Sequence, residues 1–328
     1  MKAIVVSTPG GPEVLRVAEV PDPVPGEREV VIDVRAAALN RADLLQRRGV
    51  YPPPPGASSV LGLECAGVVS ALGPGIAAAQ VGDQVMALLP GGGYAERVAV
   101  HEQLLLPIPP GLSFEQAAAI PEAFLTASEA LFTLGRTLPG EWVLVHAAAS
   151  GVGSAAVELA CRAGARVLAT TSAGKVARVR ELGAERVVAR ESEDFVAAAL
   201  EVTGGQGVDV IVDLVGGAYF AKHAACLGSL GRHVVVGLVG GAKAEIDLSR
   251  VLSRRHSILG LVMRTRSVLD KIAVVERFRR QWLHRFADGG LVPLVDSVFP
   301  LADAAGAHER MEANANVGKI VLQLGDGS

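Results

Sequence analysis

Residues 143–153, Val-Leu-Val-His-Ala-Ala-Ala-Ser-Gly-Val-Gly, begin as an apolar strand and end in a run of small residues. Dinucleotide-binding proteins place the pattern G-x-G-x-x-G between a strand and a helix, and its three positions hold Ala148, Ser150 and Gly153 here. The spacing predicts a pyrophosphate site at the N-terminus of the next helix, while a small-residue turn without nucleotide remains the alternative. The residues predicted to contact the cofactor in this turn are Ala149, Ser150, Gly151, Val152 and Gly153.

Apolar runs and helical segments alternate around this turn. We predict strands at residues 142–146, 166–171, 186–188, 208–214 and 233–238, and helices at 153–163, 175–182, 195–202 and 220–227. The predicted strands are apolar on both faces, which is typical of a parallel sheet covered by helices on each side. The sequence therefore predicts an α/β Rossmann domain with a doubly wound parallel sheet.

The first ~120 residues have a different texture, because short β-rich runs alternate with Gly and Pro turns. This pattern indicates a mostly antiparallel β domain. Residues 40–48 are expected to form a short helix, and the run Tyr-Pro-Pro-Pro-Pro-Gly at residues 51–56 a stiff surface loop. After Gly289 the chain becomes β-like again, so we expect this tail to return to the first domain.

The second strand of the alternating region indicates which dinucleotide binds. NAD sites place Asp or Glu about 20 residues after the first glycine position, where it holds the ribose 2′-hydroxyl. Residues 168–175 contain no acid and instead offer Thr171, Ser172 and Lys175, with Arg190 after the third strand as a second cation. Guanidinium and ammonium groups suit a 2′-phosphate, so we predict NADPH as the cofactor. The alternative is that Lys175 and Arg190 are ordinary surface charges.

Composition and charge argue against several classes of protein. The chain of 328 residues has a net charge of -3, which gives no reason to expect a nucleic-acid or membrane partner. Its three cysteines are scattered and form no Cys-x-x-Cys pair, which argues against a disulfide framework and suits a reducing cytosol. The first six residues resemble a strand rather than a signal peptide, so we expect a cytoplasmic protein.

Several motifs resemble the zinc-free quinone oxidoreductases of the medium-chain dehydrogenase/reductase superfamily, the zeta-crystallin-like group. The segments that carry the resemblance lie at residues 38–43, 51–56, 61–64, 82–85, 146–153, 213–217, 311–314 and 318–322. Residues 87–93 and 116–123 are most similar to the branch that vertebrates induce through a tumour suppressor during oxidative stress. The resemblance spans essentially the whole chain.

The resemblance implies an architecture and a set of site residues. It implies a GroES-like domain at residues 1–121, completed by residues 291–328, a Rossmann domain at residues 122–290, an active site in the cleft between them and a homodimer. It places Asn40 and Tyr51 near the nicotinamide as catalytic candidates. For Asn40 the alternative is a helix N-cap with Asp43 three residues on, and for Tyr51 a packing role. Further residues at the cofactor would be Thr126, Val215, Leu238 and Asn316.

The resemblance also argues against a catalytic metal. Where zinc alcohol dehydrogenases of the superfamily have a Cys and a Gly-His-Glu motif, this chain has Asn40 and Gly-Leu-Glu at residues 62–64, and it lacks a four-cysteine lobe. The seven histidines are dispersed along the sequence, so we predict no metal site. Without a Lewis acid, alcohol oxidation is disfavoured, whereas the reduction of an electrophilic acceptor remains feasible.

We therefore expect NADPH-dependent reduction of small quinones. One alternative is an NADPH-dependent enone or alkenal reductase on the same scaffold, which differs only in the shape of its pocket. Another is a non-catalytic NADPH-binding protein with a structural or RNA-associated role. The near-neutral charge and the lack of basic stripes with aromatic residues argue against RNA.

Overall fold

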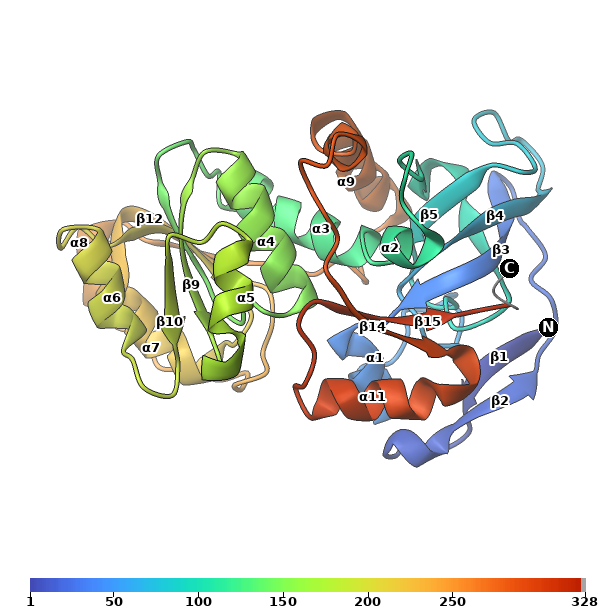
Figure 1. Ribbon diagram of the computed structural model, residues 1–328, viewed down its shortest axis with the longest axis horizontal. Helices are drawn as coiled ribbons and strands as arrows, with labels where there is room; N and C mark the ends of the chain where they lie inside the picture. Colours follow the sequence, from blue (N-terminus) through green and yellow to red (C-terminus); the bar gives the residue numbers. More distant parts are fainter. Residues whose placement is uncertain (326–328) are drawn as a thin grey trace. The chain divides into compact units, whose positions relative to one another are not determined.

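The computed structural model describes residues 1–325, which form two compact units (Figure 1). Unit 1 combines residues 1–125 with the chain from Met263 onward, and unit 2 comprises residues 126–262. Unit 2 is thus inserted into the sequence of unit 1. The first boundary lies close to the expected one, but the second falls at 262/263 rather than at 290/291.

The shift of the second boundary is caused by helices α9 (Val268–Gln281) and α10 (His284–Ala287), which belong to unit 1. Helix α9 buries Val274, Val275 and Phe278. The same helix contacts β7 (Leu105–Pro107), which belongs to unit 1. A helical segment after alternating strands and helices resembles one more repeat of that alternation. Only the packing partner of its apolar side assigns it to the other unit.

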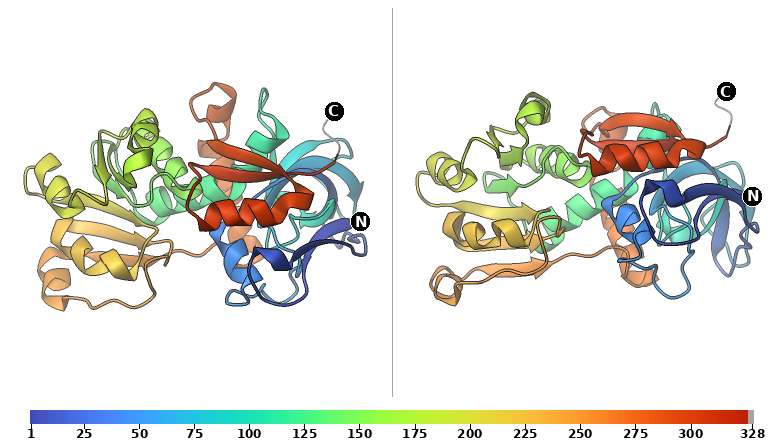
Figure 2. Two further views of the ribbon diagram at one scale, coloured as in Figure 1. Left: turned by 60° about the horizontal axis from the view of Figure 1, so that its bottom comes forward. Right: turned by 90° about the horizontal axis from the view of Figure 1, so that it is seen from below.

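Unit 1 is built on a seven-stranded sheet with the order β14-β15-β3-β4-β5-β7, in which β6 also pairs with β3. All neighbouring pairs are antiparallel except β14 and β15. Both views of Figure 2 show the C-terminal strands, in red, beside strands from the start of the chain, in blue. The C-terminal tail therefore returns to the first β domain, as the sequence indicates.

The remaining elements of unit 1 surround this sheet. Strands β1 (Lys2–Val6) and β2 (Leu15–Glu19) form a separate antiparallel pair. The sheet strands are β3 (Glu29–Ala38), β4 (Glu64–Leu72), β5 (Gln84–Leu88), β6 (Arg97–His101), β7, β14 (Val295–Pro300) and β15 (Lys319–Gln323). The further helices are η1 (Pro12–Val14), α1 (Arg41–Arg47), η2 (Glu102–Leu104), α2 (Phe114–Ala118), η5 (Leu301–Asp303) and α11 (Ala304–Glu312), and α3 (Pro121–Ser128) crosses from unit 1 into unit 2.

Unit 2 contains a six-stranded sheet with the order β10-β9-β8-β11-β12-β13, and every neighbouring pair is parallel. This order confirms the predicted doubly wound sheet, whose strand order reverses beside β8. Its strands are β8 (Trp142–Val145), β9 (Arg166–Thr171), β10 (Arg186–Ala189), β11 (Val208–Asp213), β12 (Leu227–Val235) and β13 (Ser257–Gly260). Its helices are η3 (Glu129–Leu134), α4 (Gly151–Arg162), η4 (Ala173–Lys175), α5 (Val176–Glu181), α6 (Phe195–Val202), α7 (Gly217–Cys226) and α8 (Leu248–Arg254).

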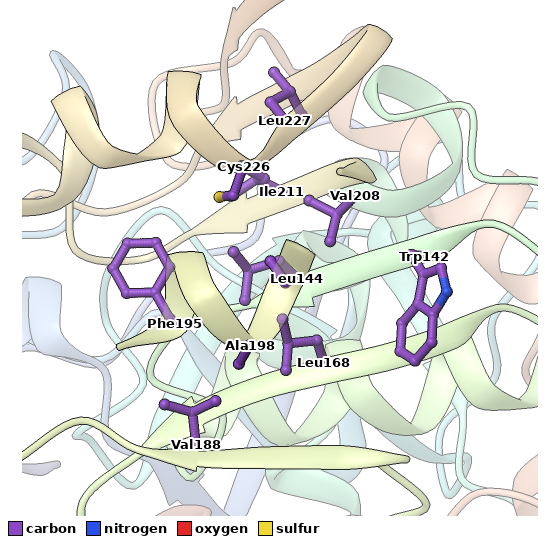
Figure 3. Packing of buried hydrophobic residues seen from close by; sticks show 11 residues of the cluster. Trp142, Leu144, Leu168, Val188, Phe195, Ala198, Val208, Ile211, Cys226 and Leu227 are labelled. Carbon is purple, nitrogen blue, oxygen red and sulfur yellow. The ribbon is translucent and has the colours of Figure 1, made fainter. Parts of the chain in front are cut away.

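One face of this parallel sheet packs against α6 and α7 through apolar side chains (Figure 3). Leu144, Leu168 and Ile211 from three neighbouring strands meet Phe195 of α6 and Cys226 of α7 in this cluster. The strands are therefore held by their neighbours and by this face, which places their carboxyl ends at fixed positions for the loops that follow.

Within residues 1–325, every helix is too short or too polar to cross a lipid bilayer.

Candidate functional site

The small-residue turn after β8 has the geometry of a pyrophosphate site. The Ser150 hydroxyl accepts a hydrogen bond from the Gly153 N–H at 3.1 Å and so caps α4. A Cβ atom on Gly153 would lie 2.3 Å from the Ala147 carbonyl oxygen, so only glycine allows the helix to approach the turn this closely. The first N–H groups of a helix have no acceptor within the helix, and those of Gly151 and Val152 are available to an anion.

The other predicted cofactor residues of unit 2 follow the neighbouring strands. Thr171 ends β9, Ser172 and Lys175 follow it, and Arg190 follows β10. Val215 comes after β11, and Leu238, which is 54% exposed, comes after β12. Because parallel strands have their carboxyl ends at one edge of the sheet, these residues share that edge with the turn after β8. Asn316 lies in unit 1, where its amide donates to the Gly318 carbonyl at 2.7 Å.

The structure brings a carboxylate to the end of β9 that is not apparent in the local sequence. Glu191, which follows Arg190 after β10, accepts a hydrogen bond from the Ala173 N–H at 3.0 Å. Its other carboxylate oxygen accepts from Arg190 Nε at 3.0 Å, and this bond holds the pKa of Glu191 below its ordinary value. Residues 168–175 contain no acid, but Glu191 brings one to the end of β9 and pairs with Arg190, one of the two cations predicted to bind the 2′-phosphate. The sequence of this strand alone is therefore insufficient to predict NADPH.

Thr126, near the end of α3, supplies a further indication of a bound molecule. Its side chain is buried, and its hydroxyl finds no hydrogen-bond partner within residues 1–325. A buried hydroxyl without a partner is costly, so a polar group from outside the chain is the simplest explanation. Together with the turn after β8, this observation fits a nicotinamide dinucleotide.

A buried polar cluster in unit 1 contains the first catalytic candidate, Asn40. Asn40 occupies the N-cap position of α1, where its backbone N–H donates to Asp43 at 2.7 Å. Its side-chain amide donates to Glu64 Oε1 at 2.9 Å and accepts from Lys319 Nζ at 2.8 Å. Lys319 Nζ also lies 2.6 Å from Glu64 Oε1. Both interpretations of Asn40 thus coexist, because its backbone begins a helix while its side chain joins a buried ion pair.

Glu122, in the first turn of α3, borders this cluster. Its backbone N–H donates to the second oxygen of Glu64 at 2.7 Å, and its side chain is half-buried. Burial, reinforced by the negative charge of Glu64, raises the pKa of Glu122 to about 8. Its carboxyl group is therefore largely protonated at neutral pH. A carboxylic acid that keeps its proton at pH 7 is able to act as a general acid.

Tyr51, the second catalytic candidate, is held by Arg264. The guanidinium of Arg264 lies 5.2 Å from the centre of the Tyr51 ring and donates to the Tyr51 carbonyl at 3.2 Å. The same group bonds the side chain of Gln46 and the carbonyl of Pro90, so it ties three segments of unit 1 together. Burial raises the pKa of Tyr51, so its hydroxyl stays protonated at neutral pH and keeps its ability to donate a hydrogen bond.

A third group of polar side chains lies behind α1. Tyr94 donates its hydroxyl proton to Asp43 at 3.1 Å, and the Gly62 N–H donates to the other oxygen of that carboxylate at 3.2 Å. Burial raises the pKa of Asp43 to about 6 in spite of these bonds. His308 lies between Tyr94 and the buried Arg47 guanidinium, 3.1 Å from the latter. These fully buried groups position α1 and are shielded from solvent.

Three of the histidines that are dispersed along the sequence come together in the structure. His146, His223 and His233 are all buried in unit 2, where His223 and His233 lie beside Asp213 and His146 contacts His223. Burial lowers the pKa of His146 to about 3 and that of His223 to about 2, so both imidazoles are neutral. They are widely separated in sequence, and the parallel pairing of β8, β11 and β12 brings their elements together.

Sequence reasoning misses Glu122, Arg264 and Lys319 as members of the site. Glu122 stands within one of the family-like motifs, but no spacing rule joins it to Lys319, nearly 200 residues later. One usable signal exists for Lys319, because a lysine at the start of an apolar strand is unusual unless its charge is paired. No comparable signal identifies Arg264.

Comparison with known proteins places this architecture in a family. Residues 26–110 match the family model of the alcohol dehydrogenase GroES-like domain, and residues 182–322 match that of a zinc-binding dehydrogenase. The human synaptic vesicle membrane protein VAT-1 homolog is 33% identical over 343 residues, which cover 99% of this chain and 87% of that protein. The chain belongs to the medium-chain dehydrogenase/reductase superfamily.

Two solved structures and one much longer relative extend the comparison. The Escherichia coli quinone oxidoreductase complexed with NADPH is 30% identical with a TM-score of 0.90, and the match covers 99% of this chain and 100% of that one. The CurK enoyl reductase is also 30% identical, with a TM-score of 0.88 and 99% of both chains covered. The mycocerosic acid synthase-like polyketide synthase of Mycobacterium tuberculosis is 34% identical over 97% of this chain. The chain spans only 15% of the length of that polyketide synthase.

The zinc in the name of one matched family does not fit the cluster around Asn40. A catalytic zinc site needs about three N, S or O ligands that face an open position. Here the ammonium of Lys319 bonds both Glu64 and Asn40 Oδ1, so a cation of the chain itself occupies the acceptors. Leu63 beside them is apolar and buried. The residues of this cluster therefore do not fit a catalytic zinc ion.

Proposed function

We propose that this chain reduces quinones with NADPH, and that it belongs to the zeta-crystallin-like zinc-free quinone oxidoreductases, in the tumour-suppressor-inducible branch. The observation that carries the proposal is the cluster of unit 1, in which the ammonium of Lys319 pairs with Glu64 while burial raises the pKa of the neighbouring Glu122. Such a cluster offers protons and hydrogen bonds but no Lewis acid. It suits an acceptor that is already electrophilic.

Each residue has a defined role in the proposed reaction. A bound nicotinamide supplies the hydride. Tyr51 donates a hydrogen bond to the acceptor oxygen, and Arg264 fixes the loop that carries this tyrosine. Glu122 gives its carboxyl proton to the reduced acceptor, so that a quinone gains one hydride and one proton and leaves as the neutral hydroquinone. Glu122 then recovers a proton from water. Asn40 and Lys319 hold Glu64, whose carboxylate positions the first turn of α3 through the Glu122 N–H.

An enone or enoyl reductase is the second candidate. It is favoured by Glu122, because hydride addition to an activated double bond also requires a proton donor for the neighbouring carbon. The likeness to the CurK enoyl reductase supports the same reaction class. A panel of quinones, alkenals and enones, followed by the loss of NADPH absorbance, tests both. We expect the highest kcat/KM with a quinone. Higher values for enones would favour the second candidate, and no oxidation of NADPH with any acceptor would indicate a non-catalytic binding protein.

We predict a preference for NADPH over NADH that depends on charge at the end of β9. Lys175→Ala and Arg190→Ala should each lower kcat/KM for NADPH about tenfold, since a charge-assisted hydrogen bond contributes roughly 1.5–3 kcal/mol. Glu191→Gln should raise the preference for NADPH, because it removes a negative charge from the place proposed for the 2′-phosphate. NADH should be nearly unaffected by the two alanine substitutions. A parent protein that prefers NADH would show that Glu191 serves as the ribose-binding acid.

The cytoplasmic location and the homodimer remain predictions, which fractionation of the source cells and sedimentation of the purified chain would test.

A further inference from the structure

Three buried side chains of unit 2 converge from three elements. Asp213 ends β11, His223 lies on α7 and His233 on β12, and none of them is more than 2% exposed. One carboxylate oxygen and two imidazole nitrogens of these residues all lie within 4.8 Å of one another. Within residues 1–325 this is the one group of three such side chains with that geometry.

Two distances define the arrangement around Asp213 Oδ2. His233 Nε2 lies 2.9 Å from this oxygen, and His223 Nδ1 lies 3.5 Å from it. The other oxygen, Oδ1, accepts hydrogen bonds from the N–H groups of Val215 and Gly216, both at 2.8 Å. The carboxylate is thus fixed by the backbone on one side and presents Oδ2 to the two imidazoles.

His223 Nδ1 has no hydrogen-bond partner within residues 1–325. Its other nitrogen, Nε2, lies 2.9 Å from His146 Nε2, and His146 Nδ1 lies 2.8 Å from the Thr170 hydroxyl. If His223 donates through Nε2, the chain of bonds continues through His146 to Thr170, and Nδ1 carries a lone pair. That lone pair then faces a carboxylate oxygen across 3.5 Å of dry interior, and two acceptors in this position repel each other.

A cation between these acceptors removes the repulsion. We propose that Asp213, His223 and His233 bind one divalent transition-metal ion, with Zn²⁺ as the ion that best fits two imidazoles and one carboxylate. Tetrahedral bonds of about 2.0–2.1 Å separate ligand atoms by roughly 3.3 Å, and two of the present separations already lie within a few tenths of an ångström of that value. A water molecule taken up together with the ion would complete the fourth position.

Binding also requires a consistent set of protons. In the metal-bound state His233 would carry its proton on Nδ1, so that Nε2 binds the metal, and His223 would donate through Nε2 to His146. Ligand histidines commonly donate their second nitrogen in this way, and the bond orients the ring. The ion would join β11, α7 and β12 at the edge of the sheet where the cofactor is proposed to bind. The site lies in unit 2 and is independent of the Asn40 cluster of unit 1.

Metal content tests this proposal without reference to activity. The chain is produced without a histidine tag in zinc-supplemented medium, dialysed to remove loosely bound metal, and analysed by plasma mass spectrometry. We expect about one Zn²⁺ per chain in the parent, and at least about tenfold less in His223→Asn and His233→Asn, because each loses a ligand. His284→Asn, which removes an exposed histidine of α10, should retain the parent value.

Cobalt provides a second measurement that uses the parent alone. The chain refolded with Co²⁺ should show the visible absorption bands of a tetrahedral site, and Zn²⁺ should displace them. Their presence supports the proposal even if the histidine variants fail to fold. A folded parent that holds neither metal, or His223→Asn and His233→Asn variants that bind as much zinc as the parent, would overturn it. In that case His223 carries its proton on Nδ1 and directs this N–H toward Asp213.

Discussion

Replacement of Glu122 by Gln is expected to lower kcat for quinone reduction by about 100-fold or more, because general acids typically contribute 10²–10⁴-fold to a rate. Glutamine keeps the shape of the side chain and the backbone bond to Glu64, but it has no acidic proton to give. The affinity for NADPH, measured by fluorescence titration, should change little. A variant with the parent kcat would exclude Glu122 as the proton donor.

The pH profile provides an independent test of the same role. Glu122 must be protonated to act, and burial raises its pKa to about 8, so kcat of the parent should be constant near pH 7 and fall as the pH rises through about 8. The Glu122→Gln variant should lack this fall. The midpoint of this pH profile depends on more than Glu122 alone, because several charged or titratable groups interact electrostatically with it. These groups are Asp43, Tyr51, Glu64, Arg264, Lys271 and Lys319.

Two matched variants separate the role of Glu122 from general effects. Tyr51→Phe removes one hydrogen bond to the acceptor, worth about 0.5–1.5 kcal/mol, and should lower kcat roughly two- to tenfold. Glu115→Gln removes a carboxylate from the first turn of α2 and should leave kcat unchanged. A loss of several orders of magnitude in Tyr51→Phe would instead identify this tyrosine as the obligatory proton donor.

Replacement of Lys319 by Met is expected to destabilise the protein by about 3–5 kcal/mol, because it leaves the charge of Glu64 buried without its counter-ion. Lys319 and Glu64 are 5% and 0% exposed, and the ammonium also donates to the Leu39 carbonyl at 2.6 Å. A loss of this size corresponds to a fall in melting temperature of roughly 6–20 °C for a unit of this size. Calorimetry of the two proteins measures it directly.

The control for this prediction removes the second charge of the pair. The double variant Lys319→Met/Glu64→Gln should recover a large part of the lost stability, since it buries no unpaired carboxylate. Arg97→Met, which breaks exposed ion pairs with Asp22 and Asp33 in the same unit, should cost less than about 1 kcal/mol. Equal losses of stability in Lys319→Met and Arg97→Met would show that the buried ion pair contributes no more to stability than an exposed one.

The order of local patterns along the sequence is sufficient to predict both folds. A parallel βαβ unit is predicted from the apolar runs at residues 142–146 and 166–171 and from the small-residue turn between them. These features can be recognised in the sequence because they depend only on residues that are neighbours in the chain. The same is true of the short N-terminal strands. Edge strand β13 escapes prediction, since it is short and mostly exposed. The return of the tail from Gly289 is predictable. The contacts group the two helices before it with unit 1, whereas the family resemblance implied a boundary at 290/291.

The candidate site depends on contacts that no local pattern contains. Asn40 and Tyr51 are predicted as site residues, yet the ionic partner of Glu64 is Lys319 from the last strand. The two meet because β3 pairs with β15 on one side and with β4, which begins at Glu64, on the other. Glu191 reaches the end of β9 in the same way, through the parallel pairing of β10. The sequence by itself determined which strands and helices form, because propensity and periodicity act over short distances. The tertiary structure alone decided which charged groups meet, and so which carboxyl group has its pKa raised.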